Sequence, residues 1–170
     1  MQKNFDRALQ FVLIHEGGYS DHPDDPGGAT MKGITLDAFR RHFGEDKTTE
    51  DLRNITQDQL RKIYKIDYWD KCRADELPSG VDYATFDAAV NSGSWRASSW
   101  LQAAVGAGRD GVIGPKTLGK IAAHEPIVII QRQCDYRLEF LRGLSTFAIF
   151  GRGWMRRIKD VRQQAIEMSE

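Results

Sequence analysis

One stretch of the sequence places carboxylates, glycines and a hydroxyl where they could cleave a glycosidic bond. Glu16 starts the segment EGGY, and the segment DPGGAT runs from Asp25 to Thr30. Such a cleavage needs a protonated acid beside the leaving oxygen and a second group that positions water or stabilises the cation-like sugar. A carboxylic acid at the base of a cleft keeps its proton more readily than one in open water. In a catalytic interpretation of this segment, Glu16 is the acid, Asp25 stays ionised and Thr30 holds the attacking water.

The same residues also have a purely structural interpretation. A glutamate before two glycines is commonly a charge at a helix end, and an Asp-Pro-Gly-Gly run is commonly a turn. Spacing alone does not choose between these interpretations, so both stay open at this point.

The elements that must position these groups are mainly helices. Apolar residues recur every three or four positions between 5 and 13, which predicts a helix over 5–16 that stops at Gly17-Gly18. No such period follows up to residue 34, so this stretch is either a long irregular loop or a small hairpin. Long loops in compact domains commonly carry function.

Helical patterns resume at Thr35 and continue along the rest of the sequence. The segments 48–51 and 56–59 each have the pattern of a capping box, which predicts two short helices. Further helices are expected over 79–90, over 94–105, from Pro115, over 126–143, and after Gly151 and Gly153. The predicted fold is therefore mainly α, with about eight helices and a possible short β-hairpin between residues 19 and 35.

Composition excludes several classes of protein. The 170 residues are 41% hydrophobic and 28% charged, which fits a globular chain rather than a disordered or fibrous one. No apolar run approaches the roughly 20 residues of a membrane-spanning helix, and the start of the sequence lacks the pattern of a Sec signal peptide. Cys72 and Cys134 lie far apart without a CxxC motif, and we expect both to be buried thiols of a reducing cytoplasm.

Motifs for other kinds of catalysis are absent from the sequence. Position 19 is tyrosine, so His15 and Glu16 do not begin an HExxH zinc motif. No glycine pattern for nucleotide phosphates follows an expected strand, and no Gly-x-Ser-x-Gly is present. We therefore expect neither a metal nor a cofactor.

The net charge is zero, but the two signs are unevenly distributed. Residues 1–90 carry five more acidic than basic side chains, and residues 91–170 carry five more basic than acidic ones. The basic excess is concentrated in a cluster near the end of the sequence, whose members are Arg152, Arg156, Arg157, Lys159 and Arg162. This basic cluster could face an anionic partner such as cell wall, lipid or nucleic acid, or it could be the solvated face of a helix.

The segment EGGYSDHPDDPGGATMKGIT, residues 16–35, resembles the signature of glycoside hydrolase family 108. The similarity continues through YKIDYW at 64–69, FDAAVNSG at 86–93 and DGVIGPKT at 110–117. Members of that family are lysozyme-like N-acetylmuramidases, found as phage endolysins and as prophage-derived proteins of toxin secretion. The resemblance implies a lysozyme-like fold, with a catalytic region over residues 1–105 and a helical peptidoglycan-binding subdomain over 106–170.

The resemblance also implies roles for individual residues. The family's catalytic glutamate corresponds to Glu16, and Asp25 and Thr30 correspond to residues that assist it. Met31 stands where many relatives carry asparagine, which would alter affinity or substrate preference if that asparagine contacts sugar. The candidate substrate-binding residues are Tyr19, Thr35, Tyr68, Trp69 and Asn91.

Several of these candidates have structural alternatives. The rings of Tyr19, Tyr68 and Trp69 could stack on pyranose faces, but Tyr68 and Trp69 fit an apolar core equally well. Asn91 could bind an acetamido group, or it could cap a helix before Gly93.

Three functions are compatible with these features. The first is a peptidoglycan hydrolase that cleaves the β-1,4 bond between N-acetylmuramic acid and N-acetylglucosamine, with Glu16 as general acid, for phage-type lysis or for wall remodelling in toxin secretion. The second is a non-catalytic peptidoglycan-binding module that uses the segment DGVIGPKT. The third, a binder of nucleic acid or anionic lipid, is the weakest because net charge is zero and the sequence has no recognisable motif of interleaved basic and aromatic residues.

The first function carries expectations about location and partners. The expected partner is the glycan strand of peptidoglycan. We expect the protein neither to bind nucleic acid nor to insert stably into a membrane. A chain made in the cytoplasm without a Sec signal needs a holin or another export route to act on the wall in the periplasm.

Overall fold

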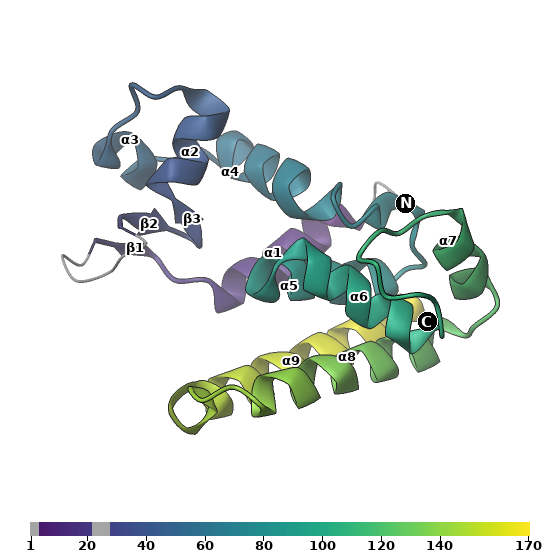
Figure 1. Cartoon of the computed structure of the whole chain (residues 1–170). Helices are drawn as coiled ribbons and strands as arrows, with labels where there is room; N and C mark the ends of the chain where they lie inside the picture. The colour runs from purple at the N-terminus through teal and green to yellow at the C-terminus, as the bar shows by residue number, and fades with distance from the viewer. Residues whose placement is uncertain (1–3, 22–27) are drawn as a thin grey trace. The chain divides into compact units, whose positions relative to one another are not determined.

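The computed structural model describes residues 4–21 and 28–170 (Figure 1). Within these residues the chain forms nine α-helices, two short helical segments and three two-residue strands, which confirms the mainly α fold with a small antiparallel sheet. The chain forms two compact units: one is Leu9–Asp67, and the other joins the chain up to Ala8 with Tyr68–Glu170. We call them the hairpin unit and the helical unit.

The hairpin unit contains most of α1 (Phe5–His15), the whole sheet and three further helices. Strands β1 (Tyr19–Ser20), β2 (Thr30–Met31) and β3 (Ile34–Thr35) pair antiparallel in the order β1-β2-β3. The helices are α2 (Leu36–Phe43), α3 (Thr49–Arg53) and α4 (Gln57–Tyr64). The stretch for which the sequence left a loop or a hairpin open therefore contains a hairpin with one additional strand.

Both predicted capping boxes are present in the hairpin unit. The Thr48 hydroxyl accepts the backbone N–H of Asp51, whose carboxylate accepts the backbone N–H of Thr48. Thr56 and Gln59 make the same reciprocal pair at the start of α4. Each pair satisfies two backbone donors that a helix start otherwise leaves without a partner.

The helical unit is built around α5 (Val81–Ser92), whose residues from Val81 to Ala89 are all buried. Phe5, Trp69 and Phe86 form an aromatic cluster with ring centroids 5.2–5.8 Å apart. This unit also holds α6 (Ser94–Ala104), α7 (Pro115–Ala122), α8 (Pro126–Arg142), α9 (Phe147–Ser169) and the short segment Ala74–Glu76. The chain passes from the hairpin unit into this one within a π-helix, Lys65–Trp69.

A buried ion cluster joins three helices of this unit. The Asp87 carboxylate of α5 accepts hydrogen bonds from Arg137 of α8 at 2.7 Å and from Arg157 of α9 at 2.9 Å. Burial by itself raises the pKa of Asp87, but the two guanidiniums more than offset this, so that the pKa lies below its usual range. Asp87 is therefore an ionised core residue whose role is structural.

One sequence expectation about the helical unit was wrong. Gly151 and Gly153 were expected to precede the last helix, but α9 runs through both of them. Gly151 is buried, and a Cβ there would lie 2.9 Å from the Phe147 ring, so glycine permits that ring to pack on the helix. The boundary expected at residue 106 lies within the helical unit, and the division into a catalytic region and a peptidoglycan-binding subdomain stays a prediction.

The segment DGVIGPKT is held inward by one buried side chain of α6. The Gln102 amide nitrogen donates to Asp110 at 2.6 Å and to the carbonyl oxygen of Val112 at 3.0 Å, and its oxygen accepts the N–H of Gly111. The hydrogen bond from Gln102 lowers the pKa of Asp110. The polar groups of this motif thus stabilise the turn that precedes α7, and a role for it in binding peptidoglycan stays a prediction.

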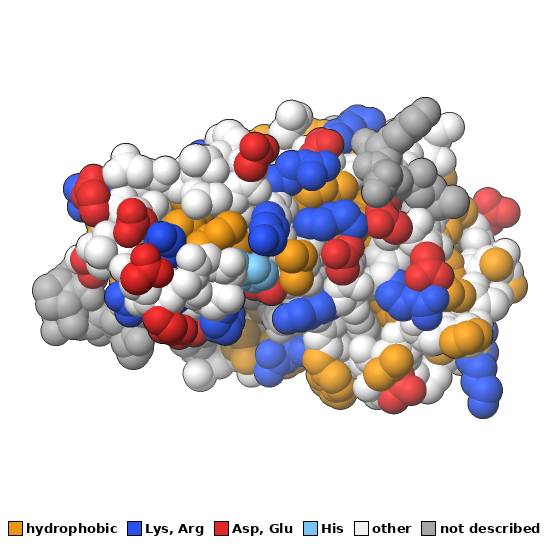
Figure 2. All heavy atoms as spheres, turned by 90° about the horizontal axis from the view of Figure 1, so that it is seen from above, with side chains coloured by type: hydrophobic (Ala, Val, Ile, Leu, Met, Phe, Trp, Pro, Cys, Tyr) orange, Lys and Arg blue, Asp and Glu red, His pale blue; other side chains and the backbone are white. Residues whose placement is uncertain are grey.

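Other features of the described residues complete the fold. Cys72 and Cys134 are free and buried as expected, and burial raises the pKa of both thiols to about 11. In the described parts of the chain, every helix is too short or too polar to cross a bilayer. On the face of the molecule seen in Figure 2, basic and acidic side chains lie beside one another, so neither sign dominates there.

Candidate active site

Glu16 lies immediately after the last residue of α1 and is half-buried. The helix fixes the backbone that leads into this residue, because its hydrogen bonds restrain each turn. Gly17 and Gly18 follow with open space around them, and β1 begins at Tyr19. Glu16 thus lies between a helix that restrains its backbone and two glycines that have open space around them.

A tight turn between β2 and β3 lies against this carboxyl group. Thr30 pairs with Thr35 and Met31 pairs with Ile34, which leaves Lys32 and Gly33 as a two-residue loop. Both have positive φ, 48° and 76°, as the favoured hairpin turn requires. A Cβ on Gly33 would lie 2.7 Å from Glu16 Oε2, so only glycine lets the turn approach the carboxyl this closely.

Tyr64 holds the turn from a third direction. It is the last residue of α4 and is 1% exposed, and its hydroxyl donates to the carbonyl oxygen of Lys32 at 2.7 Å. The same hydroxyl would be 2.8 Å from a Cβ on Gly33. The end of α1, the hairpin turn and the end of α4 therefore meet at Glu16.

Sequence reasoning did not name Gly33 or Tyr64 as site residues. Tyr64 belongs to the segment YKIDYW, which contributed to the family resemblance. The hydrogen bond from Tyr64 to Lys32 spans 32 positions. No local pattern predicts a contact of that separation.

The two residues expected to assist Glu16 differ in how far the structure describes them. Thr30 is half-buried in β2, where it pairs with Ser20 of β1 and with Thr35 of β3. Asp25 lies outside the described residues. Thr30 and Glu16 therefore belong to the same unit, and the relation of Asp25 to them stays a prediction.

Tyr19 and Thr35 have other contacts in the hairpin unit. The Arg53 guanidinium lies 4.2 Å from the centre of the Tyr19 ring, and the Tyr19 hydroxyl donates to Asp21. Arg53 thus occupies part of the aromatic surface that was expected to stack on sugar. The Thr35 hydroxyl accepts the N–H of Ala38 at 3.1 Å and caps α2, so its first role is structural.

Trp69 belongs to the core of the helical unit rather than to a binding surface. It is 0% exposed, its ring packs against Phe5 and Phe86, and its indole nitrogen donates to Asp75 at 2.8 Å. No sugar can stack on a ring that is covered in this way, which argues for the structural alternative at this position. Tyr68 is half-buried and stays a candidate.

Asn91 lies in the last turn of α5, where it lines a pocket of about 250 Å³. Its side-chain oxygen accepts hydrogen bonds from Arg137 at 3.0 Å and from Ser92 at 3.2 Å. Gly93 occupies the cap position of α5, so the capping alternative for Asn91 is wrong. The other residues that line this pocket are Ser92, Arg96, Phe140, Leu141, Leu144 and Trp154.

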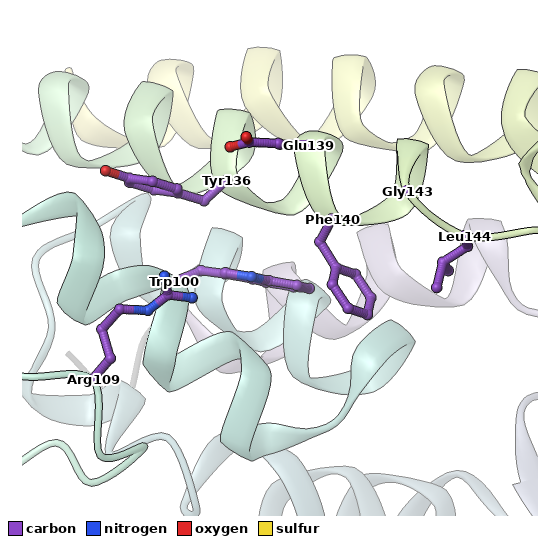
Figure 3. A pocket seen from close by; sticks show the side chains of 7 residues that line it. All are labelled: Trp100, Arg109, Tyr136, Glu139, Phe140, Gly143 and Leu144. Atoms are coloured by element: carbon purple, nitrogen blue, oxygen red, sulfur yellow. The ribbon is translucent and has the colours of Figure 1, made fainter.

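A larger pocket of about 490 Å³ shares Phe140 and Leu144 with the first (Figure 3). Figure 3 shows Tyr136 and Phe140 on the side of α8 that faces the Trp100 and Arg109 side chains, while the Glu139 side chain lies along α8. Arg109 Nε donates to the Ser99 hydroxyl at 3.0 Å. Aromatic surface beside a cation and a carboxylate is suited to ligands with both apolar and polar faces. Sequence reasoning did not predict this pocket, because its residues come from two helices and a loop.

The described residues contain no group of three or more His, Cys, Asp or Glu side chains that could hold a metal ion. Near the end of α1 the hairpin unit holds the Glu16 carboxyl group beside the turn at Gly33, and the Tyr64 hydroxyl lies beside the same turn. This arrangement can deliver a proton at a defined point.

Comparison with known proteins identifies a family whose model covers this part of the chain. The model of the glycosyl hydrolase 108 family matches residues 9–93, a range that contains Glu16, the hairpin, Tyr64 and Asn91. A solved structure, described as the structure of Brucella abortus SagA, is 43% identical in sequence, with a TM-score of 0.89. The alignment covers 100% of this chain and 98% of that one. No curated protein matches the sequence.

Proposed function

Because this chain belongs to the glycosyl hydrolase 108 family and is therefore a peptidoglycan hydrolase of the muramidase-like kind, we propose that Glu16 is its general acid. The bond cleaved is the β-1,4 linkage between N-acetylmuramic acid and N-acetylglucosamine. Glu16 donates its proton to the bridging oxygen as that bond breaks.

The observation that supports this assignment is the contact of Glu16 with the hairpin turn. A Cβ on Gly33 would lie 2.7 Å from Glu16 Oε2, and the Tyr64 hydroxyl is bonded to the same turn. A carboxyl that only marked a helix end would need neither a glycine with positive φ nor a buried tyrosine beside it. Groups that act in catalysis are held in this way by rigid neighbours, because small displacements lower the rate strongly.

Thr30 and Asp25 complete the proposed chemistry. The Thr30 hydroxyl, in the strand that leads into the turn, holds the attacking water, and an ionised Asp25 stabilises the cation-like sugar or activates that water. Substrate contacts come from Tyr19, Tyr68 and Asn91. Thr35 acts mainly by capping α2 behind the hairpin.

The helical unit provides the second part of the proposal. The two pockets beside Phe140 offer aromatic faces, an amide and charged groups, which suit the sugars and peptides of the wall. We assign binding of peptidoglycan beyond the cleaved bond to these pockets rather than to DGVIGPKT, whose polar groups bond to Gln102.

The setting in which the enzyme acts is also proposed. Its substrate lies in the periplasm, and a holin or another export route delivers the folded protein to it. The biological purpose is lysis of the phage type or local opening of the wall for toxin secretion.

Mass spectrometry of digested sacculi tests the bond assignment. Wild-type protein should release fragments with a reducing N-acetylmuramic acid end. Fragments with reducing N-acetylglucosamine, or with anhydro ends, would contradict the muramidase assignment while leaving the family unchanged. Binding to sacculi without release of any fragment would favour the alternative of a non-catalytic peptidoglycan-binding module.

A further inference from the structure

The end of α8 and the first turns of α9 carry exposed apolar side chains among arginines. Ile149 is 75% exposed and Phe150 is 53% exposed, although both are large hydrophobic residues. Arg142, Arg152 and Arg156 are exposed beside them in the chain. We call these five residues the tip patch. Within the helical unit, Figure 1 shows this end of the α8–α9 hairpin projecting beyond α5 and α6.

Helical spacing brings apolar and cationic groups of the tip patch onto one face. Ile149, Arg152 and Arg156 follow one another at intervals of three and four residues in α9, so their side chains share its outer face. Gly151 and Ile158 are buried and lie on the opposite side of the helix. Packing of α9 against its neighbours therefore leaves the mixed face exposed.

The charge of this region has a single sign. The sequence has no acidic residue between Phe140 and Lys159. Arg157 is bonded to Asp87 in the core and Arg162 pairs with Asp135, so two members of the basic cluster are neutralised. Among the described residues, Arg142, Arg152 and Arg156 form no ion pair. By contrast, Arg41 and Arg53 of the hairpin unit pair with Asp37 and Glu50.

We propose that the tip patch docks the protein on the surface of a bilayer that contains anionic phospholipids. At such a surface, isoleucine and phenylalanine side chains enter the boundary between headgroups and acyl chains, and arginines bind lipid phosphates while their stems lie along the apolar layer. An anionic polymer in water would pair with the arginines but would leave Ile149 and Phe150 exposed. The end of a helical hairpin can also approach a flat surface without rearrangement of the core. The inference is independent of the hydrolytic function.

Sedimentation of the full-length protein with lipid vesicles tests this proposal. Wild-type protein should bind vesicles of phosphatidylcholine and phosphatidylglycerol in equal parts, and should not bind phosphatidylcholine alone. Binding should weaken with salt because the lipid charge is screened. Each of Arg152→Gln and Arg156→Gln should lower the partition coefficient about fivefold, and Ile149→Ser should lower it roughly tenfold.

Matched controls lie elsewhere on the helical unit. Val112 is 66% exposed and Lys116 is exposed on α7, so Val112→Ser and Lys116→Gln make comparable changes, loss of an aliphatic side chain and loss of a positive charge, away from the tip. These variants should bind vesicles as the wild type does. Ile149→Ser should also retain wild-type hydrolysis of soluble peptidoglycan fragments, which shows that it is folded.

Two results would overturn the proposal. One is the absence of wild-type binding to anionic vesicles, or equal binding by the tip variants and the wild type. The other is loss of binding to purified peptidoglycan in the tip variants with no vesicle binding by any form, which would make the partner an anionic polymer instead.

Discussion

Two carboxylates, Glu16 in the hairpin unit and Asp87 in the helical unit, are held in opposite ways. Asp87 is fully buried and accepts hydrogen bonds from two arginines on two other helices. Glu16 is half-buried and rests against a glycine turn that a tyrosine hydroxyl fixes. The neighbours of Asp87 compensate a charge, whereas Gly33 leaves room beside Glu16. The difference separates a carboxylate that stabilises the fold from the one that we propose as the general acid.

The largest change in stability should follow from Asp87→Asn. This substitution keeps the shape of the side chain but leaves two buried guanidiniums without a counter-charge. Breaking a buried ion pair in this way costs about 3–5 kcal/mol, so Tm should fall by about 6–20 °C for a chain of this size. Calorimetry measures the shift. At temperatures where the variant is folded, its kcat should equal that of the wild type. A loss of kcat in the folded variant would mean that Asp87 also contributes to catalysis, which contradicts a purely structural role.

The same interaction should titrate in acid. The pKa of Asp87 is lowered in the folded state, so its contribution to stability is present above the unfolded pKa of about 3.9 and is lost as the pH falls through the folded pKa. Burial raises the pKa of Asp82, so its effect on the free energy of unfolding has the opposite pH dependence. The stability that Asp82 contributes is present below its unfolded pKa and is lost as the pH rises through its folded pKa.

Denaturant unfolding between pH 7 and pH 2 measures this dependence. Below about pH 4, wild-type stability should fall more steeply than that of Asp87→Asn, because only the wild type has the Asp87 carboxyl to protonate. Parallel curves for the two proteins would show that the cluster does not titrate as its geometry indicates.

On the Glu16 side, Gly33→Ala should affect activity more than stability. An alanine at φ +76° costs about 1–2 kcal/mol, and its Cβ would displace the Glu16 carboxyl or the Tyr64 hydroxyl. A displacement of this kind can lower kcat by about 10- to 100-fold. Gly106→Ala is the matched control, because Gly106 has φ +67° and open space around it. Similar kcat in both variants would mean that the turn does not position Glu16.

The smallest of these effects should come from Tyr64→Phe. It removes the hydrogen bond from the Tyr64 hydroxyl to the Lys32 carbonyl, a bond worth about 1 kcal/mol. Tm should fall by about 2–4 °C, and kcat should fall several-fold because the turn loses its tether. Steady-state kinetics and calorimetry on one preparation give both numbers. A lower Tm with unchanged kcat would make Tyr64 a structural residue only.

Local features of the fold were predictable from the sequence. The capping boxes at Thr48 and Thr56 depend on residues three positions apart, and Pro115 and Pro126 begin α7 and α8 as expected. The path of α9 through Gly151 was not predictable, because it depends on the packing of Phe147 onto that glycine.

The site was predictable only in part. Glu16 could be named from the order of residues in EGGY and DPGGAT, but the contacts that position it come from α4 and from a turn whose φ angles no composition reveals. The burial of Trp69 depends on Phe5 and Phe86, and the role of Asp87 depends on arginines 50 and 70 positions away. Contacts between residues that are distant in the sequence thus decide whether a side chain lies at the surface or in the core.

The most direct measurement of the central claim is kcat and Tm of Glu16→Gln, with Glu45→Gln as the control for an exposed glutamate of the same unit. Removal of a general acid should lower kcat by about 100- to 10,000-fold, with Tm within about 2 °C of the wild type because Glu16 is half-buried rather than enclosed in the core as Asp87 is. Glu45→Gln should match the wild type in both. Hydrolysis by Glu16→Gln within tenfold of the wild-type rate would contradict the account.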